Sequence, residues 1–268
     1  MGWKFVRASP APILWGLVMD YRGFRDDAPS RSVQREPASP RASLILDIGS
    51  GWRVTTPATE QRERLGAFAV GIHDRPALVE AAGPALCVQV DLSPFGARRL
   101  FGVPMHELVD RAVSIEHVLG RTGSELTERL AEMQDWPGRF ACIDAELERR
   151  LDGAPVVSPE VEWAWRQLVN TSGALPIGEL IDELGWSRKR LVARFRDGIG
   201  LAPKTAARLL RFEALRARLQ AGHASISWAR LATECGFFDQ AHLIRDVHEF
   251  AGMTPTELLA SLTPGRHA

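Results

Sequence analysis

A helical run near the carboxyl end carries side chains that can form paired hydrogen bonds to flat polar edges. In residues 235–255, CGFFDQAHLIRDVHEFAGMTP, the apolar spacing puts Gln240 and Arg245 on the side opposite Leu243. Gln can pair with two edge atoms of adenine and Arg with two acceptors of guanine, while Ile244 suits a thymine methyl group. The run therefore predicts a helix whose outer face can read base-pair edges.

The same pattern occurs about fifty positions earlier, in residues 184–203, LGWSRKRLVARFRDGIGLAP. Each copy has a glycine, an aromatic residue, a polar capping residue, a helical run, and then Gly with Pro three residues on. Gly185 and Gly236 are 51 positions apart, whereas Pro203 and Pro255 are 52 apart, so the second copy holds one extra residue. Two helices joined by a short Gly-containing turn form a helix-turn-helix, whose second helix enters the major groove of DNA.

The second helix of each copy must face two environments. Its inner stripe packs on the partner helix and is predicted to be Leu191 and Phe195 in the first copy, and Leu243, Val247 and Phe250 in the second. The residues predicted to face bases are Arg188, Lys189, Val192, Ala193, Arg196, Gln240, Ala241, Ile244 and Arg245. Weaker phosphate contacts are predicted for Ser187, Arg208, Arg211 and Asp239, of which Ser187 and Asp239 also suit a helix N-cap.

A long helix is expected between the copies, starting at Pro203 and carrying apolar residues at three- and four-residue steps. Some 17 residues give a rod of roughly 25 Å. From Arg188 to Arg218 there are ten basic and two acidic residues, an excess of eight positive charges over 31 residues. The rod could therefore hold two recognition helices about one DNA turn apart, with basic residues nearby.

The plainer reading of each feature is structural. One amphipathic helix pair is more often ordinary bundle packing, and a basic stripe alone is usually a solvated face. A bundle has no need, however, for a matched turn, cap, glycine and proline at a fixed offset. The duplication therefore favours a DNA-binding function. Thr254–Glu257 has the sequence of a capping box and is expected to start a last helix.

The composition is that of a globular protein. The 268 residues are 45% hydrophobic and 25% charged, with formal net charge zero. Three widely spaced cysteines, Cys87, Cys142 and Cys235, predict neither a disulfide framework nor a metal pair. No apolar run is long enough to span a membrane and no secretory signal is evident, so we expect a cytoplasmic protein without metal or cofactor.

The order of strand-like and helix-like segments along the sequence predicts an α+β protein. Short β-type runs, including residues 43–48, 51–55, 67–72 and 85–92, suggest an amino-terminal β-barrel or sandwich over 1–104, the candidate sensing domain. Residues 105–151 are expected to form a helical connector and the candidate dimerisation region, with continuous helix over 105–119. A linker at 152–159 precedes the all-α domain at 160–268. Residues 26–41 are expected to form a loop.

Residues 172–261 resemble the DNA-binding domain of AraC/XylS-type bacterial transcriptional regulators. The most specific segment is ATECGFFDQAHLIRDVHEFAGMTPTEL, and residues 88–110, VQVDLSPFGARRLFGVPMHELVD, resemble a sensing domain of one branch with less specificity. The resemblance places base-reading positions at Lys189, Val192, Ala193, Gln240, Ala241, Ile244 and Arg245. Many members have Arg at the position of Ala193, so the first motif is expected to read fewer bases directly.

The predicted function is a sequence-specific, double-stranded DNA-binding transcriptional regulator that reads two successive major-groove segments and is controlled by a small-molecule effector. The resemblance also implies RNA polymerase as a partner, and the protein is expected to be an activator. The amphipathic helices between 105 and 151 suggest a homodimer. The alternative is an enzyme or DNA-repair protein with a β-rich catalytic domain fused to a DNA-binding domain. Residues 1–150 show no paired catalytic groups, cysteine cluster or metal triad, so we expect no enzyme.

Overall fold

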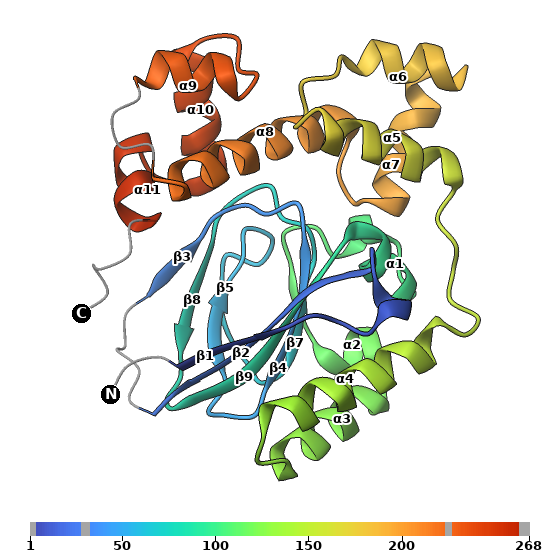
Figure 1. Cartoon of the computed structure of the whole chain (residues 1–268), viewed down its shortest axis with the longest axis vertical. Helices are drawn as coiled ribbons and strands as arrows, with labels where there is room; N and C mark the ends of the chain where they lie inside the picture. Colours follow the sequence, from blue (N-terminus) through green and yellow to red (C-terminus); the bar gives the residue numbers. More distant parts are fainter. Residues whose placement is uncertain (1–3, 28–32, 223–226, 263–268) are drawn as a thin grey trace.

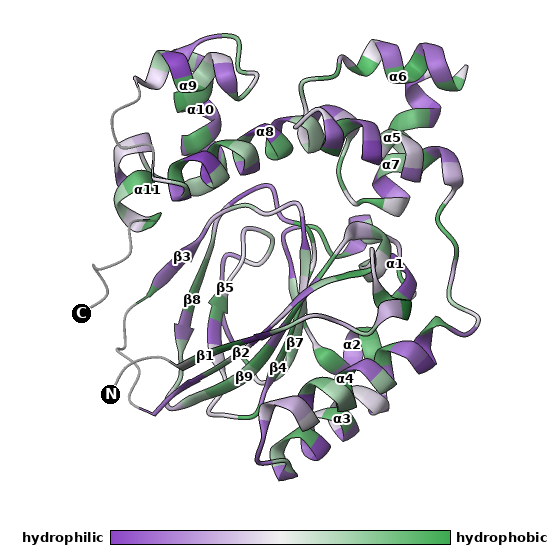
Figure 2. Cartoon of the chain, viewed as in Figure 1, coloured by the Kyte–Doolittle hydropathy of each residue, from purple (hydrophilic) through white to green (hydrophobic). Residues whose placement is uncertain are grey.

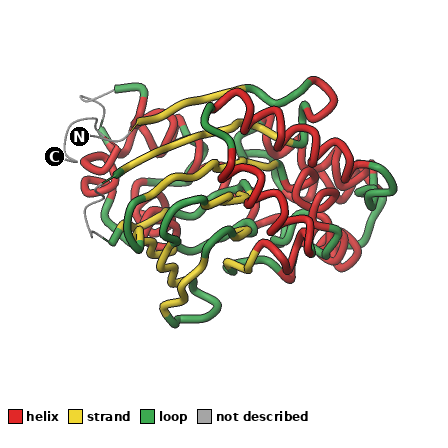
Figure 3. Tube along the Cα trace, turned by 90° about the horizontal axis from the view of Figure 1, so that it is seen from below, coloured by secondary structure: helices red, strands yellow, loops and turns green. Residues whose placement is uncertain are grey.

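The computed structural model describes residues 4–27, 33–222 and 227–262. Within these ranges the strands form two antiparallel sheets, as Figures 1 and 3 show. The six-stranded sheet has the order β1 (Lys4–Ala8), β2 (Val18–Asp26), β9 (Ala85–Leu92), β4 (Ala42–Asp47), β7 (Phe68–Val70) and β10 (Ala112–Ser114). The four-stranded sheet has the order β3 (Gln34–Glu36), β8 (Ala77–Ala81), β5 (Trp52–Thr55) and β6 (Arg62–Leu65). The predicted α+β class with an amino-terminal sandwich is confirmed.

Alternation along the strands builds a core on each face of the larger sheet. In β9, Cys87 belongs to the cluster between the two sheets, together with Phe24 and Trp52, whose rings meet edge to face at 5.7 Å. Val88 and Val90 point the other way, into the cluster beneath the helices. The period of two in a strand explains how one run of apolar residues serves both cores.

Helices cover the outer face of the larger sheet. These are α1 (Pro94–Phe101), α2 (Ile115–Leu119), α3 (Arg121–Glu132) and α4 (Trp136–Leu151), with short 3-10 turns η1 (Pro12–Leu14) and η2 (Met105–Glu107) beside them. Tyr21 of β2 stacks on Phe140 of α4, with ring centroids 5.7 Å apart. The Tyr21 hydroxyl donates a 2.7 Å hydrogen bond to Asp144, and its burial together with this bond raises the pKa of Tyr21. Sheet and helices therefore share one core.

Two expectations about local structure were wrong. Residues 105–119 are not one helix, because β10 pairs with β7 from Ala112 to Ser114 and only α2 follows as helix. In this segment, the hydrogen bonds that β10 makes to β7 stabilise a strand, although the apolar residues are spaced as in a helix. The expected loop at 26–41 contains the end of β2 and all of β3; its residues 28–32 lie outside the described ranges.

The carboxy-terminal region is helical throughout its described residues. It comprises α5 (Pro159–Asn170), α6 (Ile177–Leu184), α7 (Arg188–Gly198), α8 (Pro203–Gln220), α9 (Trp228–Glu234), α10 (Gln240–Ala251) and α11 (Pro255–Leu262). In Figure 1, α8 crosses the molecule with α5–α7 at one end and α9–α11 at the other. Figure 2 shows hydrophobic and hydrophilic residues interleaved along these helices, as expected where one side packs inward. No helix in the described part combines the length and hydropathy needed to cross a bilayer.

The sandwich touches the helical region at several places, two of which lie beside the predicted recognition helices. At one, the Ala38 N–H donates a 2.7 Å hydrogen bond to the Phe250 carbonyl at the end of α10. Arg35 also donates to the Gly252 carbonyl in the turn after that helix. At the other place, the turn after α7 lies so close to η2 that a Cβ on Gly200 would meet Val109 at 2.9 Å. Both of these contacts are made at the carboxyl end of a predicted recognition helix, whereas Arg41, just before β4, pairs with Glu213 of α8 at 3.7 Å.

Candidate nucleic-acid interface

The two helix-turn-helix units are built on equivalent turns. Gly185 and Gly236 have positive φ of 59° and 75°, which lets the chain reverse after α6 and α9. The aromatic residue after each glycine is buried, Trp186 in the first unit and Phe237 in the second. Both turns therefore anchor the start of the following helix in the hydrophobic core.

Each recognition helix starts at a side-chain cap. The Ser187 hydroxyl accepts a hydrogen bond from the Arg190 N–H at 3.2 Å, and the Asp239 carboxylate accepts one from the His242 N–H at 2.7 Å. A cap satisfies one of the N–H groups that have no partner within the helix. The capping role expected for Ser187 and Asp239 is thus confirmed; their phosphate contacts stay predictions.

The inner faces of α7 and α10 pack as expected. All five residues of the predicted inner stripes are fully buried, namely Leu191, Phe195, Leu243, Val247 and Phe250. Leu180 of α6 and Leu231 of α9 are buried in the same cluster. Thr254 and Glu257 form the expected capping box, because each accepts a hydrogen bond from the other's backbone N–H.

The outer faces carry the residues predicted to read bases, and none of them is buried. Val192 and Ile244 are half-buried, and the exposed ones are Arg188, Lys189, Ala193, Arg196, Gln240, Ala241 and Arg245. Each helix therefore presents a polar surface beside one aliphatic side chain. That combination can pair with base edges and also contact a thymine methyl group.

Arg208 and Arg211 have partners within the protein. Arg208 of α8 donates to Asp246 at 2.7 Å and also to Glu249, and the Glu249 carboxylate, with Asp246 adding, raises the pKa of Arg208. Arg211 donates to the Gly173 carbonyl at 2.9 Å, and burial lowers its pKa. These contacts fix α8 against α10 and against the loop after α5. The phosphate contacts of both residues stay predictions.

Sequence reasoning left out several exposed residues beside the recognition helices. Arg190 and Arg194 are exposed on α7, and the Arg190 guanidinium stacks over Trp186 at 4.5 Å. Phe238 has an exposed fraction of 92% and directly precedes the Asp239 cap. The signal that singles out Phe238 was present in the sequence: it lies where the repeat offset changes from 51 to 52.

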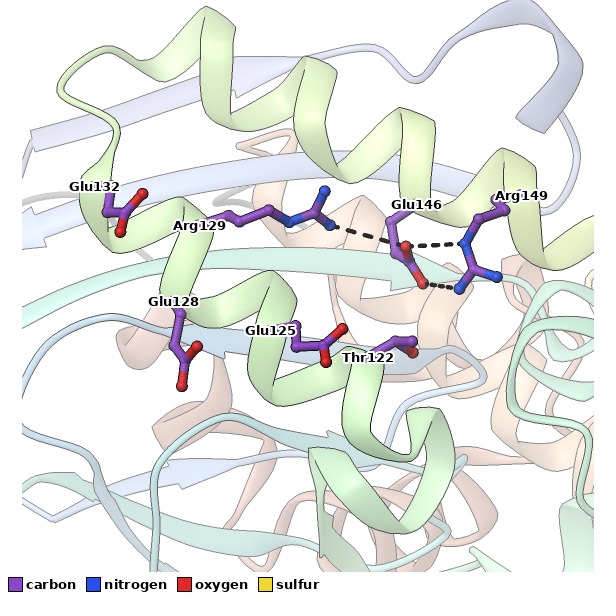
Figure 4. A pocket seen from close by; sticks show the side chains of 7 residues that line it. All are labelled: Thr122, Glu125, Glu128, Arg129, Glu132, Glu146 and Arg149. Atoms are coloured by element: carbon purple, nitrogen blue, oxygen red, sulfur yellow. Dashed lines mark hydrogen bonds and ion pairs between the residues drawn. The ribbon is translucent and has the colours of Figure 1, made fainter.

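A charged groove lies far from these helices, between α3 and α4 (Figure 4). Its volume is about 500 Å³, and it is lined by Thr122, Glu125, Glu128, Arg129, Glu132, Glu146 and Arg149. Glu146 is only 7% exposed and receives a 2.7 Å hydrogen bond from Arg149. The groove is therefore organised by its own ion pairs. No group of three His, Cys, Asp or Glu side chains suited to a metal ion occurs among the described residues.

The fold and the two capped units define the class of protein. Residues 180–261, from α6 to α11, match the family model of a helix-turn-helix domain. This carboxy-terminal part of the chain is therefore a helix-turn-helix domain, and it contains the two units that the sequence predicts. No curated protein sequence matches the chain.

Solved structures of ToxT from Vibrio cholerae share the fold of the whole chain. An apo ToxT variant from strain SCE256 is 12% identical with a TM-score of 0.53, over 91% of this chain and 98% of that one. Wild-type ToxT with a bound unsaturated fatty acid is 9% identical, with a TM-score of 0.54 over 97% and 100%. ToxT from O395 bound to (E)-4-(8-methylnaphthalen-1-yl)but-3-enoic acid is 12% identical, with a TM-score of 0.51 over 92% and 100%. At identities this low, the structural similarity establishes a common architecture and nothing more specific.

Proposed function

We propose that this protein is a sequence-specific transcriptional regulator that reads two successive major-groove segments of double-stranded DNA. The observation that carries the proposal is the pair of capped helix-turn-helix units at the two ends of α8. An 18-residue helix is roughly 27 Å long, which is close to one turn of DNA at about 34 Å. In this proposal α7 and α10 occupy neighbouring major grooves, and their exposed polar residues pair with bases.

The test is selection of bound DNA from a random library with the full chain, followed by salt titration of the selected site. We expect a bipartite site whose halves are about one helical turn apart. The logarithm of affinity should fall linearly with the logarithm of salt concentration, by about 0.9 for each phosphate neutralised. Absence of any selected sequence, with binding insensitive to salt, would refute the proposal.

We propose further that the amino-terminal domain binds a small-molecule effector. Support comes from the shared fold with ToxT, one structure of which carries an unsaturated fatty acid. Trp52 is an internal reporter, because its ring lies between the sheets against Phe24 and its N–H donates to Asp47. Long-chain fatty acids are the first compounds to test, by tryptophan fluorescence and thermal shift. If neither signal moves across a metabolite panel, the domain has another role.

We also propose that the protein acts in the cytoplasm as a homodimer through residues 105–151, contacts RNA polymerase, and has no catalytic activity. The division into a sandwich at 1–104, a connector at 105–151, a linker at 152–159 and a DNA-binding domain at 160–268 is part of this proposal, with β10 of the connector completing the larger sheet of the sandwich. The connector is proposed as the dimer interface because its helices α3 and α4 are amphipathic. Light scattering at tens of micromolar tests it, with a monomeric mass as the contrary result.

A further inference from the structure

We propose that Phe238 is a DNA-contacting residue, whose ring packs on an apolar surface of the DNA at the start of the second recognition helix. The inference rests on the proposed DNA-binding function and adds a residue to it. Apolar surface at the groove edge comes from two sources, the methyl group of thymine and the carbons of deoxyribose. Phe238 fits contact with either.

The first support is that the turn does not need Phe238 for its own structure. In the first unit, one buried aromatic residue leads directly to the cap, as Trp186 leads to Ser187. The second unit has the same buried anchor in Phe237 and the same kind of cap in Asp239. Phe238 is the extra residue between them. The turn therefore gains nothing in burial from its side chain.

The second support is the exposure of the ring. At 92%, Phe238 is the most exposed large hydrophobic residue in the described part of the chain. Its backbone is nevertheless held, because its N–H donates to the His242 ring at 3.4 Å while that ring meets Phe237 edge to face at 5.6 Å. A fixed backbone presents the exposed ring in one region of space. An apolar ring held in solvent in this way gains free energy on contact with another apolar surface.

The third support is position. Phe238 immediately precedes the amino end of α10, the end from which helix-turn-helix proteins contact base edges and the neighbouring backbone. Gln240 and Ala241, both predicted to read bases, are exposed within three residues of it. When α10 lies in the major groove, a side chain at this turn reaches the DNA strand that borders the groove. That strand supplies the apolar surface.

The experiment compares the full chain with its Phe238→Ala variant on the DNA site selected by the wild type. We expect Phe238→Ala to bind roughly five- to thirtyfold more weakly, a loss of the size given by one apolar contact. The salt slope should not change, because no charge is removed. Phe238→Tyr should retain the affinity, and the unfolding temperature of Phe238→Ala should equal that of the wild type. Phe5→Ala, at a 67% exposed phenylalanine of β1, is the matched control and should bind normally.

A second arm identifies the surface. Each thymine in the site is replaced by uracil, which lacks only the methyl group. If one replacement weakens the wild type but not Phe238→Ala, the ring contacts that methyl group; if none does, it contacts deoxyribose. If Phe238→Ala binds DNA like the wild type, the inference is overturned while the proposed function stands. This holds also if that variant loses transcription with RNA polymerase, because the ring would then contact a protein and not DNA. A wild type that selects no DNA overturns both.

Discussion

Arg245 is the residue at which specificity and attraction can be separated most cleanly. It is exposed on the outer face of α10, and it forms no hydrogen bond or ion pair through its side chain within the described part of the protein. Arg245→Ala should therefore cost about 1–3 kcal/mol of binding and relax the preference at one base pair. Quantitative binding to all single-base variants of the site measures this. Arg121→Ala, on the distant helix α3, should change nothing; a uniform loss across all sites for Arg245→Ala would mark it as a phosphate ligand instead.

Arg208 tests the opposite case, a basic residue whose charge is used inside the protein. Its partner Asp246 is 2% exposed, so removing the guanidinium leaves a buried carboxylate without its counter-charge. Arg208→Ala should lower the free energy of unfolding by about 3 kcal/mol. The double variant Arg208→Met with Asp246→Leu should recover part of that loss, as measured by denaturant unfolding. Normal stability combined with uniformly weaker DNA binding would instead make Arg208 a phosphate contact, as the sequence predicts.

Asp74 gives the fold a pH dependence. Burial, with the charge of nearby Asp110 adding, raises the pKa of Asp74 to about 6. The folded state therefore holds this proton more tightly than the unfolded state, so the stabilisation is complete below about pH 4 and is lost as the pH rises to 6. Asp74→Asn should stabilise the protein by up to about 3 kcal/mol at pH 7 and not at pH 4, since each pKa unit is worth about 1.4 kcal/mol. Unfolding midpoints from pH 4 to 8 measure this. The same gain at both pH values would contradict the assignment, and exposed Asp152→Asn is the control.

At the scale of elements, the caps decide how firmly the recognition helices start. Asp239→Ala should lower the free energy of unfolding by about 1 kcal/mol, because the His242 N–H loses its acceptor. Asp239→Ser should restore most of the loss, since Ser187 performs the same task in the first unit. Thermal unfolding measures both variants. Equal stability of all three proteins would show that Asp239 has no capping role.

The elements also show which parts of the fold the sequence could predict. The tandem units were predictable because turn, cap and apolar stripe are local signals, and every predicted inner residue is buried. Strands β5, β7 and β9 lie within the runs predicted for them, and β4 is shifted by one residue from its predicted run. β10 was missed because its pairing partner β7 is more than 40 residues away, and the local spacing around it favours a helix. β1 and β2 were missed because the prolines and glycine between them obscured two strands that pair with each other.

In the candidate site, too, features set by local sequence could be predicted and features set by distant contacts could not. The outer residues of α7 and α10 follow from helix geometry alone, so their exposure could be predicted. The ion pairs of Arg208 could not, because Asp246 lies 38 positions away and only the packing of α8 on α10 brings them together. A count of basic residues along α8 therefore overstated the charge available to DNA. The exposure of Phe238 needed the structure as well, since most phenylalanines in a helical bundle are buried.

At the scale of the whole molecule, the sandwich holds the carboxyl ends of both recognition helices. This arrangement leaves their amino ends, with the caps and the predicted base-facing residues, directed away from the contact. The positions of α7 and α10 relative to each other are therefore set by two features, the rigid helix α8 and the contact with the sandwich. A change in the sandwich can reach the DNA-binding units through the second of these.

The contact at Ala38 is where this coupling can be broken with one substitution. Ala38 is fully buried, and its N–H donates to the carbonyl of Phe250, at the negative end of the α10 dipole. Because Ala38 belongs to the buried cluster that holds the inner residues of α10, Ala38→Asp places a carboxylate against that cluster and should open the contact while leaving α8 in place. We expect faster amide hydrogen exchange at residues 248–252 and 72–76, and unchanged exchange in α6 and α7. Ala221→Asp, exposed at the end of α8, should alter neither region. Unchanged protection at 248–252 in Ala38→Asp would mean that the sandwich does not restrain α10.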